Sequence, residues 1–209
     1  MFFYRPGWVF QQILYPRLLW RKPPDSHKQI FLTFDDGPVP ELTGHVLDIL
    51  NTHDVKATFF CVGDNIRKYP QIFKRLLQEG HQTGNHTFNH LNGWKTPAET
   101  YLQNAWLCQQ EARKHGKEMA LFRPPYGKIA RKQIKALCKS YKIVMWDVLS
   151  GDYSSAVSAQ QCLAKTLYYT RPGSIVVFHD NYKAGEKVLQ VLPLYIGKAK
   201  ERGYTFSTL

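Results

Sequence analysis

The stretch TFDDGP at residues 33–38 ends a strand-like run that begins at Gln29, and its Gly-Pro pair stops the strand. The stretch places two carboxylates, Asp35 and Asp36, side by side at the end of a buried strand. Adjacent carboxylates repel one another and are costly to desolvate. A bound cation that neutralises one of them lowers this cost. The pair therefore predicts a metal site at the end of this strand.

Two histidines follow roughly fifty residues later, His86 and His90 in the stretch NHTFNH at residues 85–90. One carboxylate and two imidazoles form a usual catalytic zinc set, which leaves coordination positions open for water and substrate. The second carboxylate is then free to act as a base on that water. The alternative is that the two histidines lie on a solvated helix face. The whole set favours a metal-dependent hydrolase.

The bulk composition is that of a folded domain. The chain has 209 residues, 44% of them hydrophobic and 21% charged, which suits one globular domain with a sizeable core. Its net charge of +12 favours polyanions or anionic membrane surfaces. The basic residues are scattered and match no nucleic-acid-binding motif, so we do not expect nucleic acid as a partner.

The N-terminal segment, residues 1–24, mixes aromatic and basic side chains. These are Phe2, Phe3, Tyr4, Trp8, Phe10, Tyr15 and Trp20, with Arg5, Arg17, Arg21 and Lys22. Its uncharged part is too short and too broken by proline, glycine and glutamine for a membrane span, and it lacks a clean signal-peptide core. The aromatics either pack on the domain, which we favour, or touch a membrane surface peripherally. We expect the catalytic domain to occupy residues 25–209.

Strand-like and helix-like segments alternate along the chain. We expect strands at 29–34, 57–62, 81–85, 119–123, 142–147, 174–178 and 204–209, and helices at 41–53, 69–79, 97–115, 130–140, 158–169 and 186–202, the last one interrupted at Pro193. This rhythm predicts a single-domain α/β fold with a mostly parallel sheet, a distorted (β/α) barrel of about seven strands. In such folds, sites form at the carboxyl ends of the strands.

Five motifs, in order, identify a family resemblance. They are TFDDGP at 33–38, HTFNH at 86–90, RPPY at 123–126, a partly kept motif at 147–153 and VFH at 177–179. In this order they resemble those of the polysaccharide deacetylase family, also called the NodB-homology domain or carbohydrate esterase family 4. The resemblance covers residues 29–209, nearly the whole chain.

The resemblance implies a role for each matching residue. Asp36, His86 and His90 would bind the metal, usually zinc in this family, with another divalent ion such as Co²⁺ or Ni²⁺ as the alternative. The metal would polarise the amide carbonyl and acidify a water. Asp35 would be the general base, although a second metal ligand is its alternative. Arg123 would pair with Asp35 and hold its orientation.

Other matching residues would complete the reaction. The backbone N–H of Tyr126 would help to hold the oxyanion, and His179 would protonate the departing amine. A carboxylate commonly orients such a histidine, and we assign this role to Asp152, with Asp147 as the alternative. For both aspartates the competing interpretation is a plain turn residue.

The chain departs from the family pattern at two positions. Tyr153 stands where the family usually has Trp, and Val177 where it usually has Leu. Both resemble positions that line the pocket for the acetyl methyl, so a pocket is kept while its shape changes. Trp94 and Trp146 are either sugar platforms or core residues.

The resemblance implies a metal-dependent hydrolase that removes N-acetyl groups from N-acetylglucosamine units of an oligo- or polysaccharide, with peptidoglycan and chitooligosaccharide as leading substrates. The alternatives are an O-acetyl esterase on a polysaccharide such as xylan and a non-catalytic carbohydrate-binding protein of the same fold. We expect the protein to be cytoplasmic or peripheral to the inner membrane, with the cell envelope as the alternative.

Overall fold

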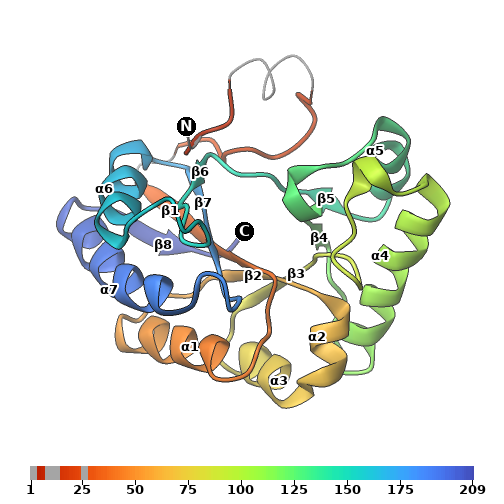
Figure 1. The fold of residues 1–209 in the computed structure, drawn as a ribbon, viewed down its shortest axis with the longest axis horizontal. Helices are drawn as coiled ribbons and strands as arrows, with labels where there is room; N and C mark the ends of the chain where they lie inside the picture. The colour runs from red at the N-terminus through yellow and green to blue at the C-terminus, as the bar shows by residue number, and fades with distance from the viewer. Residues whose placement is uncertain (1–3, 8–14, 25–27) are drawn as a thin grey trace.

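The computed structural model describes residues 4–7, 15–24 and 28–209 (Figure 1). Its strands are β1 (Gln29–Asp35), β2 (Thr58–Cys61), β3 (Gln82–Asn85), β4 (Leu121–Phe122), β5 (Lys142–Ile143), β6 (Val148–Leu149), β7 (Ile175–His179) and β8 (Thr205–Ser207). Its helices are α1 (Leu42–Thr52), α2 (Gly63–Lys68), α3 (Pro70–Gln78), α4 (Ala98–Arg113), α5 (Arg131–Leu137), α6 (Ala159–Tyr169) and α7 (Gly185–Glu201), with short 3-10 turns η2 (Gly93–Lys95) and η3 (Pro125–Gly127).

The strands form one curled parallel sheet in the order β5-β4-β3-β2-β1-β7-β6. β8 pairs with the first residues of β1, while β2 pairs with its last residues. The helices form a layer round the sheet, with α6 and α7 at one end and α4 and α5 at the other (Figure 1). This arrangement confirms the predicted distorted barrel.

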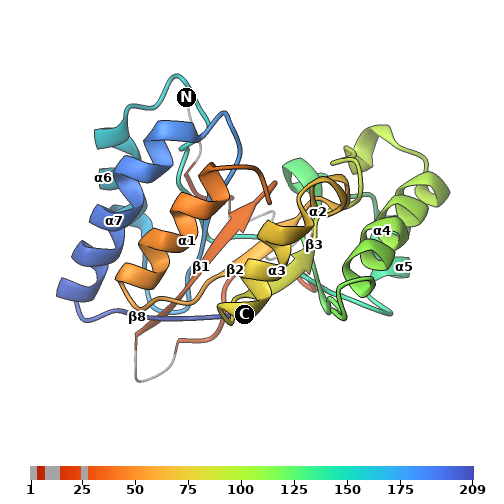
Figure 2. The ribbon, with the colours of Figure 1, turned by 90° about the horizontal axis from the view of Figure 1, so that it is seen from below.

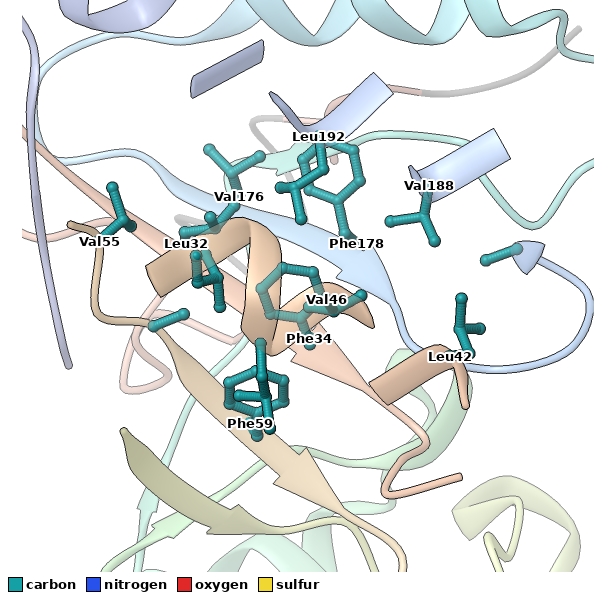
Figure 3. Close-up of a cluster of buried hydrophobic side chains, with 14 of the residues drawn as sticks. Leu32, Phe34, Leu42, Val46, Val55, Phe59, Val176, Phe178, Val188 and Leu192 are labelled. Atoms are coloured by element: carbon teal, nitrogen blue, oxygen red, sulfur yellow. The ribbon is translucent and has the colours of Figure 1, made fainter. Parts of the chain in front are cut away.

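The main core lies between the sheet and the helices. Leu32 and Phe34 of β1 pack with Val176 and Phe178 of β7 in a buried cluster (Figure 3). The row of α7, α1 and α3 lies across the outer side of β1 and β2 (Figure 2). Because successive side chains of a strand point to opposite faces of the sheet, Leu32 and Phe34 face this core, whereas Thr33 and Asp35 face the other side.

The described part of the N-terminal segment, residues 4–7 and 15–24, lies where the barrel is open, between β5 and β6 (Figure 1). The backbone N–H of Leu19 donates to the Ile143 carbonyl at 3.0 Å, and that of Met145 donates back to Leu19 at 2.7 Å. Leu18 and Trp20 are buried. These contacts favour the packing interpretation for this part of the segment, whereas residues 1–3 and 8–14 lie outside the described part. No helix in the described ranges is both long and apolar enough to cross a bilayer.

Three details of the expected secondary structure are wrong. The strand predicted at 142–147 ends after two residues as β5, because Val144 pairs with Leu19 of the N-terminal segment, and β6 begins only at Val148. The helix α2 was not predicted. Pro193 lies inside α7 without interrupting it, since buried residues on both sides of it, Leu192 and Tyr195, keep the two halves packed on the core.

Candidate active site

The site lies at the carboxyl ends of neighbouring strands. Asp35 is the last residue of β1 and stands opposite His179, the last residue of β7, in their parallel pairing. The strand β3 ends at Asn85, directly before His86. Three strand ends therefore bring together residues from the first, second and fifth motifs, as the fold class predicts.

A turn after β1 separates the two carboxylates. Asp36 has a left-handed backbone, with φ of 86°, and Asn65 of α2 donates to its carbonyl at 2.8 Å. The next position, Gly37, requires a glycine, because a Cβ there would lie 1.8 Å from the Oδ2 atom of Asp180. The Gly37 N–H instead donates to that carboxyl group at 3.0 Å. Burial raises the pKa of Asp180 to about 8.

Asp36, His86 and His90 form a cluster whose ligand atoms lie within 4.8 Å of one another. The Nε2 atoms of His86 and His90 lie 3.4 and 3.0 Å from the Asp36 Oδ1 atom. Burial works to raise the pKa of Asp36, but its interactions with His86, His90 and His179 outweigh it and hold the pKa well below its usual range. An ionised carboxylate and two imidazole nitrogens fit a divalent metal such as zinc.

The tautomer of His86 is fixed by its outer partner. Its Nδ1 atom lies 2.7 Å from the carbonyl oxygen of Arg123, and only a protonated nitrogen can donate to a carbonyl. The Nε2 atom therefore keeps a lone pair toward Asp36, which is the arrangement that a metal-binding histidine needs.

The two histidines lie on a loop and not on a helix. Thr87 and His90 both have positive φ, 63° and 55°. Asn104 of α4 holds the loop, because its Oδ1 atom accepts from the N–H groups of Phe88 and Asn89 at 2.8 and 2.9 Å. The spacing of the two histidines in the sequence did not indicate that a residue of α4 holds their loop.

Asp35 pairs with Arg123 in the interior. Arg123 is fully buried, and its Nη1 atom donates to the Asp35 Oδ1 atom at 2.6 Å and to the Thr33 hydroxyl at 2.8 Å. Its Nη2 atom donates to the Met145 carbonyl at 2.9 Å. The two neighbouring carboxylates thus have different partners, a guanidinium for Asp35 and two imidazoles for Asp36.

The structure places Asp152, and not Asp147, against His179. The Oδ1 atom of Asp152 lies 2.9 Å from the His179 Nδ1 atom, and its Oδ2 atom accepts from the His179 N–H at 2.7 Å. Burial works to lower the pKa of His179, but the Asp152 carboxylate and the two motif carboxylates raise it to about 9. Asp147 instead binds Arg171 and the hydroxyl of Ser174.

A cleft of about 710 Å³ opens over these groups. Its wall includes Val177, Tyr153 and Trp146, and the Tyr153 ring lies edge-on to His179 with centroids 4.6 Å apart. Tyr126 is exposed at the rim, with φ of 60°. Trp94 is exposed but is not among the residues that line the cleft.

Sequence reasoning missed several residues at the site. The Nδ2 atom of Asn181 donates to the Asp36 Oδ2 atom, while its Oδ1 atom accepts from the N–H groups of Lys183 and Ala184 at 2.9 and 3.0 Å. These two bonds fix the amide orientation, so a donor faces Asp36. The one sequence signal is that Asn181 lies two residues after His179. Lys128 also lines the cleft.

The family model for polysaccharide deacetylase matches residues 22–145. The chain is similar to a peptidoglycan-N-acetylglucosamine deacetylase of Bacillus cereus, with 37% identity over 190 residues that span 89% of this chain and 68% of that protein. It is 34% identical to a chitooligosaccharide deacetylase of Bradyrhizobium sp., over 77% of this chain and 74% of that protein.

A solved structure is also similar to this chain. The Bc1960 peptidoglycan N-acetylglucosamine deacetylase, in complex with an N-hydroxybenzamide compound, superposes with a TM-score of 0.89 and 33% identity, covering 96% of this chain and 94% of that one. The chain therefore belongs to the polysaccharide deacetylase family, carbohydrate esterase family 4. Its fold and relatives support a hydrolase that deacetylates polysaccharides.

Proposed function

We propose that this protein is a zinc-dependent deacetylase that removes N-acetyl groups from N-acetylglucosamine units of peptidoglycan or chitooligosaccharide. The main observation behind the proposal is that two adjacent carboxylates have different partners. Asp36 faces His86 and His90, whereas Asp35 faces Arg123. One carboxylate is placed to hold a metal and the other to accept a proton.

Asp36, His86 and His90 would hold the zinc ion, which when bound polarises the acetyl carbonyl and acidifies water. Asp35 would take the proton from the attacking water. Because Arg123 fixes one oxygen of Asp35 at 2.6 Å, this carboxylate is oriented before the substrate arrives. Pre-orientation of the base removes part of the entropic cost of reaching the transition state.

On the other side of the cleft, His179 would protonate the departing amine. Its pKa, raised to about 9 with Asp152 behind it, keeps it in the acid form at neutral pH. The backbone N–H of Tyr126 would stabilise the oxyanion of the tetrahedral intermediate. Val177 and Tyr153 would bound the pocket for the acetyl methyl, and Trp146, which lines the same cleft, would stack on the sugar ring.

The test is acetate release by the purified protein from N-acetylglucosamine oligomers and from peptidoglycan, with zinc added or removed by a chelator. We expect zinc-dependent release from at least one of these substrates. No release from either one, with zinc shown to be bound, would reject the proposal. O-acetylated xylan is the third substrate, and release from it alone would assign the esterase alternative.

A further inference from the structure

The region around α5 carries charge of one sign. Between Glu118 and Asp147 the chain contains no acidic residue. Besides Arg123, the basic residues of this stretch are Lys128, Arg131, Lys132, Lys135, Lys139 and Lys142, which we call the α5 cationic face. These six positive charges equal half of the net charge of +12, and the proposed reaction assigns them no role.

The α5 cationic face is at the surface. Arg131, Lys132, Lys135 and Lys139 are exposed. The spacing of three residues places Lys132 and Lys135 on one side of α5, and Lys139 lies in the turn directly after the helix ends at Leu137. The opposite side packs inward, because Leu137 belongs to the buried cluster that α4 also joins. α5 lies beside α4, at the end of the molecule away from α6 and α7 (Figures 1 and 2).

Several basic residues on other helices have acidic partners. Arg67 and Lys68 both pair with Asp64, and Arg75 pairs with Glu79. In the described ranges, by contrast, no ion pair involves any member of the α5 cationic face. Clustered like charges without partners repel one another, and they attract anions to the surface.

The α5 cationic face begins at the catalytic cleft. Lys128 lines the cleft, and its Nζ atom lies 5.5 Å from the centroid of the exposed Trp94 ring. Gln133 of α5 fixes this junction, since its side-chain amide donates to the carbonyls of Gly93 and Thr96 at 2.9 and 3.1 Å. An aromatic platform and a row of cations thus continue outward from the cleft.

We propose that the α5 cationic face binds the part of the substrate that extends beyond the reacting sugar, and that this part is an anionic glycan with carboxylate groups. The N-acetyl sugar lies in the cleft, a neighbouring ring stacks on Trp94, and the carboxylates of the flanking units lie on Lys128 and α5. This inference rests on the proposed function, and it names the class of chain that the enzyme prefers.

A glycan fits the α5 cationic face better than a membrane does. A helix that lies in a membrane interface presents large apolar side chains on its buried side. Among the described residues, the large hydrophobic side chains that are exposed include none from α5. A second reason to favour a glycan is that the α5 cationic face is continuous, through Lys128, with the cleft where the proposed function places the sugar.

The test compares two N-acetylated glycans of equal length. One is a neutral chitin hexamer, and the other is a peptide-free strand that alternates N-acetylglucosamine with N-acetylmuramic acid and carries a carboxylate on every second sugar. Calorimetry measures the Kd of each in an Asp35→Asn background, where no turnover is expected. The test variant adds Lys132→Gln, Lys135→Gln and Lys139→Gln. The control variant adds Lys74→Gln, Lys165→Gln and Lys198→Gln, which remove the same charge from exposed positions on other helices.

We expect the test variant to lose about tenfold in affinity for the anionic strand and less than about twofold for the neutral hexamer. The control variant should keep both affinities. The preference for the anionic strand should also shrink at high salt, because screening weakens exposed charge pairs. An equal loss in the two variants, an equal loss for the two glycans, or no loss would each overturn the inference.

Two further measurements separate the explanations. If the test variant loses binding to anionic phosphatidylglycerol vesicles while its glycan affinities stay unchanged, the α5 cationic face is a membrane surface and the inference is wrong. Acetate release from the neutral hexamer, measured with Asp35 intact, tests the proposed function separately. Acetate release together with equal affinities for the two glycans would overturn this inference and leave the proposed function intact. A higher affinity for the anionic strand without any acetate release would overturn the proposed function and leave this inference intact.

Discussion

The pair of Asp35 and Arg123 gives the sharpest prediction of stability. Arg123→Met removes the guanidinium but keeps an unbranched side chain in the buried site. The Asp35 carboxylate then stays buried without its partner at 2.6 Å. Breaking a buried pair in this way costs about 3–5 kcal/mol. The hydrogen bonds lost to Thr33 and Met145 place the expected value in the upper half of that range.

The assay is urea unfolding in the presence of a chelator, so that metal binding does not contribute to the free energy of unfolding. The double variant Asp35→Asn/Arg123→Met should recover at least about 1 kcal/mol relative to the sum of the single variants. Arg113→Met is the control, because its pair with Glu118 is exposed and should contribute less than about 1 kcal/mol. A cost for Arg123→Met no larger than that of the control would refute the reasoning.

Two further changes test how the site is tuned. Asp152→Asn should lower the pKa of His179, which is raised to about 9 in the native protein. The alkaline limb of the pH profile of kcat/KM should then move to lower pH. An unchanged alkaline limb would contradict the pairing of His179 with Asp152. By the same linkage, the stability that His179 gains from its raised pKa is complete below about pH 6.5 and is lost as the pH rises through about 9. Asn181→Ala removes the donor to Asp36 without adding charge beside it. Zinc affinity should fall by about 10–100-fold, while Asn51→Ala, the same truncation at an exposed position, should leave it unchanged; equal affinities in the two variants would exclude an effect of Asn181 on the metal site.

The sequence predicted the strands that carry the motifs well. The predicted strand at 29–34 is β1, Gln29–Asp35, and the predicted strand at 174–178 is β7, Ile175–His179. Apolar runs that stop at polar residues are strong local signals. Because parallel strands end on one edge, the order of the motifs was enough to bring Asp35 and His179 together.

The remaining features depend on contacts between distant parts of the chain. The strand predicted at 142–147 is shortened to β5 because Val144 pairs with Leu19, more than a hundred residues earlier. Nothing local in the sequence distinguishes Asp147 from Asp152, since the partners that hold Asp147 away from His179, among them Arg171 and Ser174, are brought to it by the fold. Asn104 and Asn181 were missed for a similar reason, because their partners at the site, the 86–90 loop and Asp36, are distant in sequence.

The central claim is that two adjacent carboxylates have different functions, and metal content measured together with turnover tests it most directly. Asp35→Asn should retain about one zinc per chain and lose acetate release, because it removes the proton acceptor and spares the ligands. His86→Ala should lose both zinc and acetate release. Near-normal acetate release by Asp35→Asn, or stoichiometric zinc in His86→Ala, would contradict this assignment.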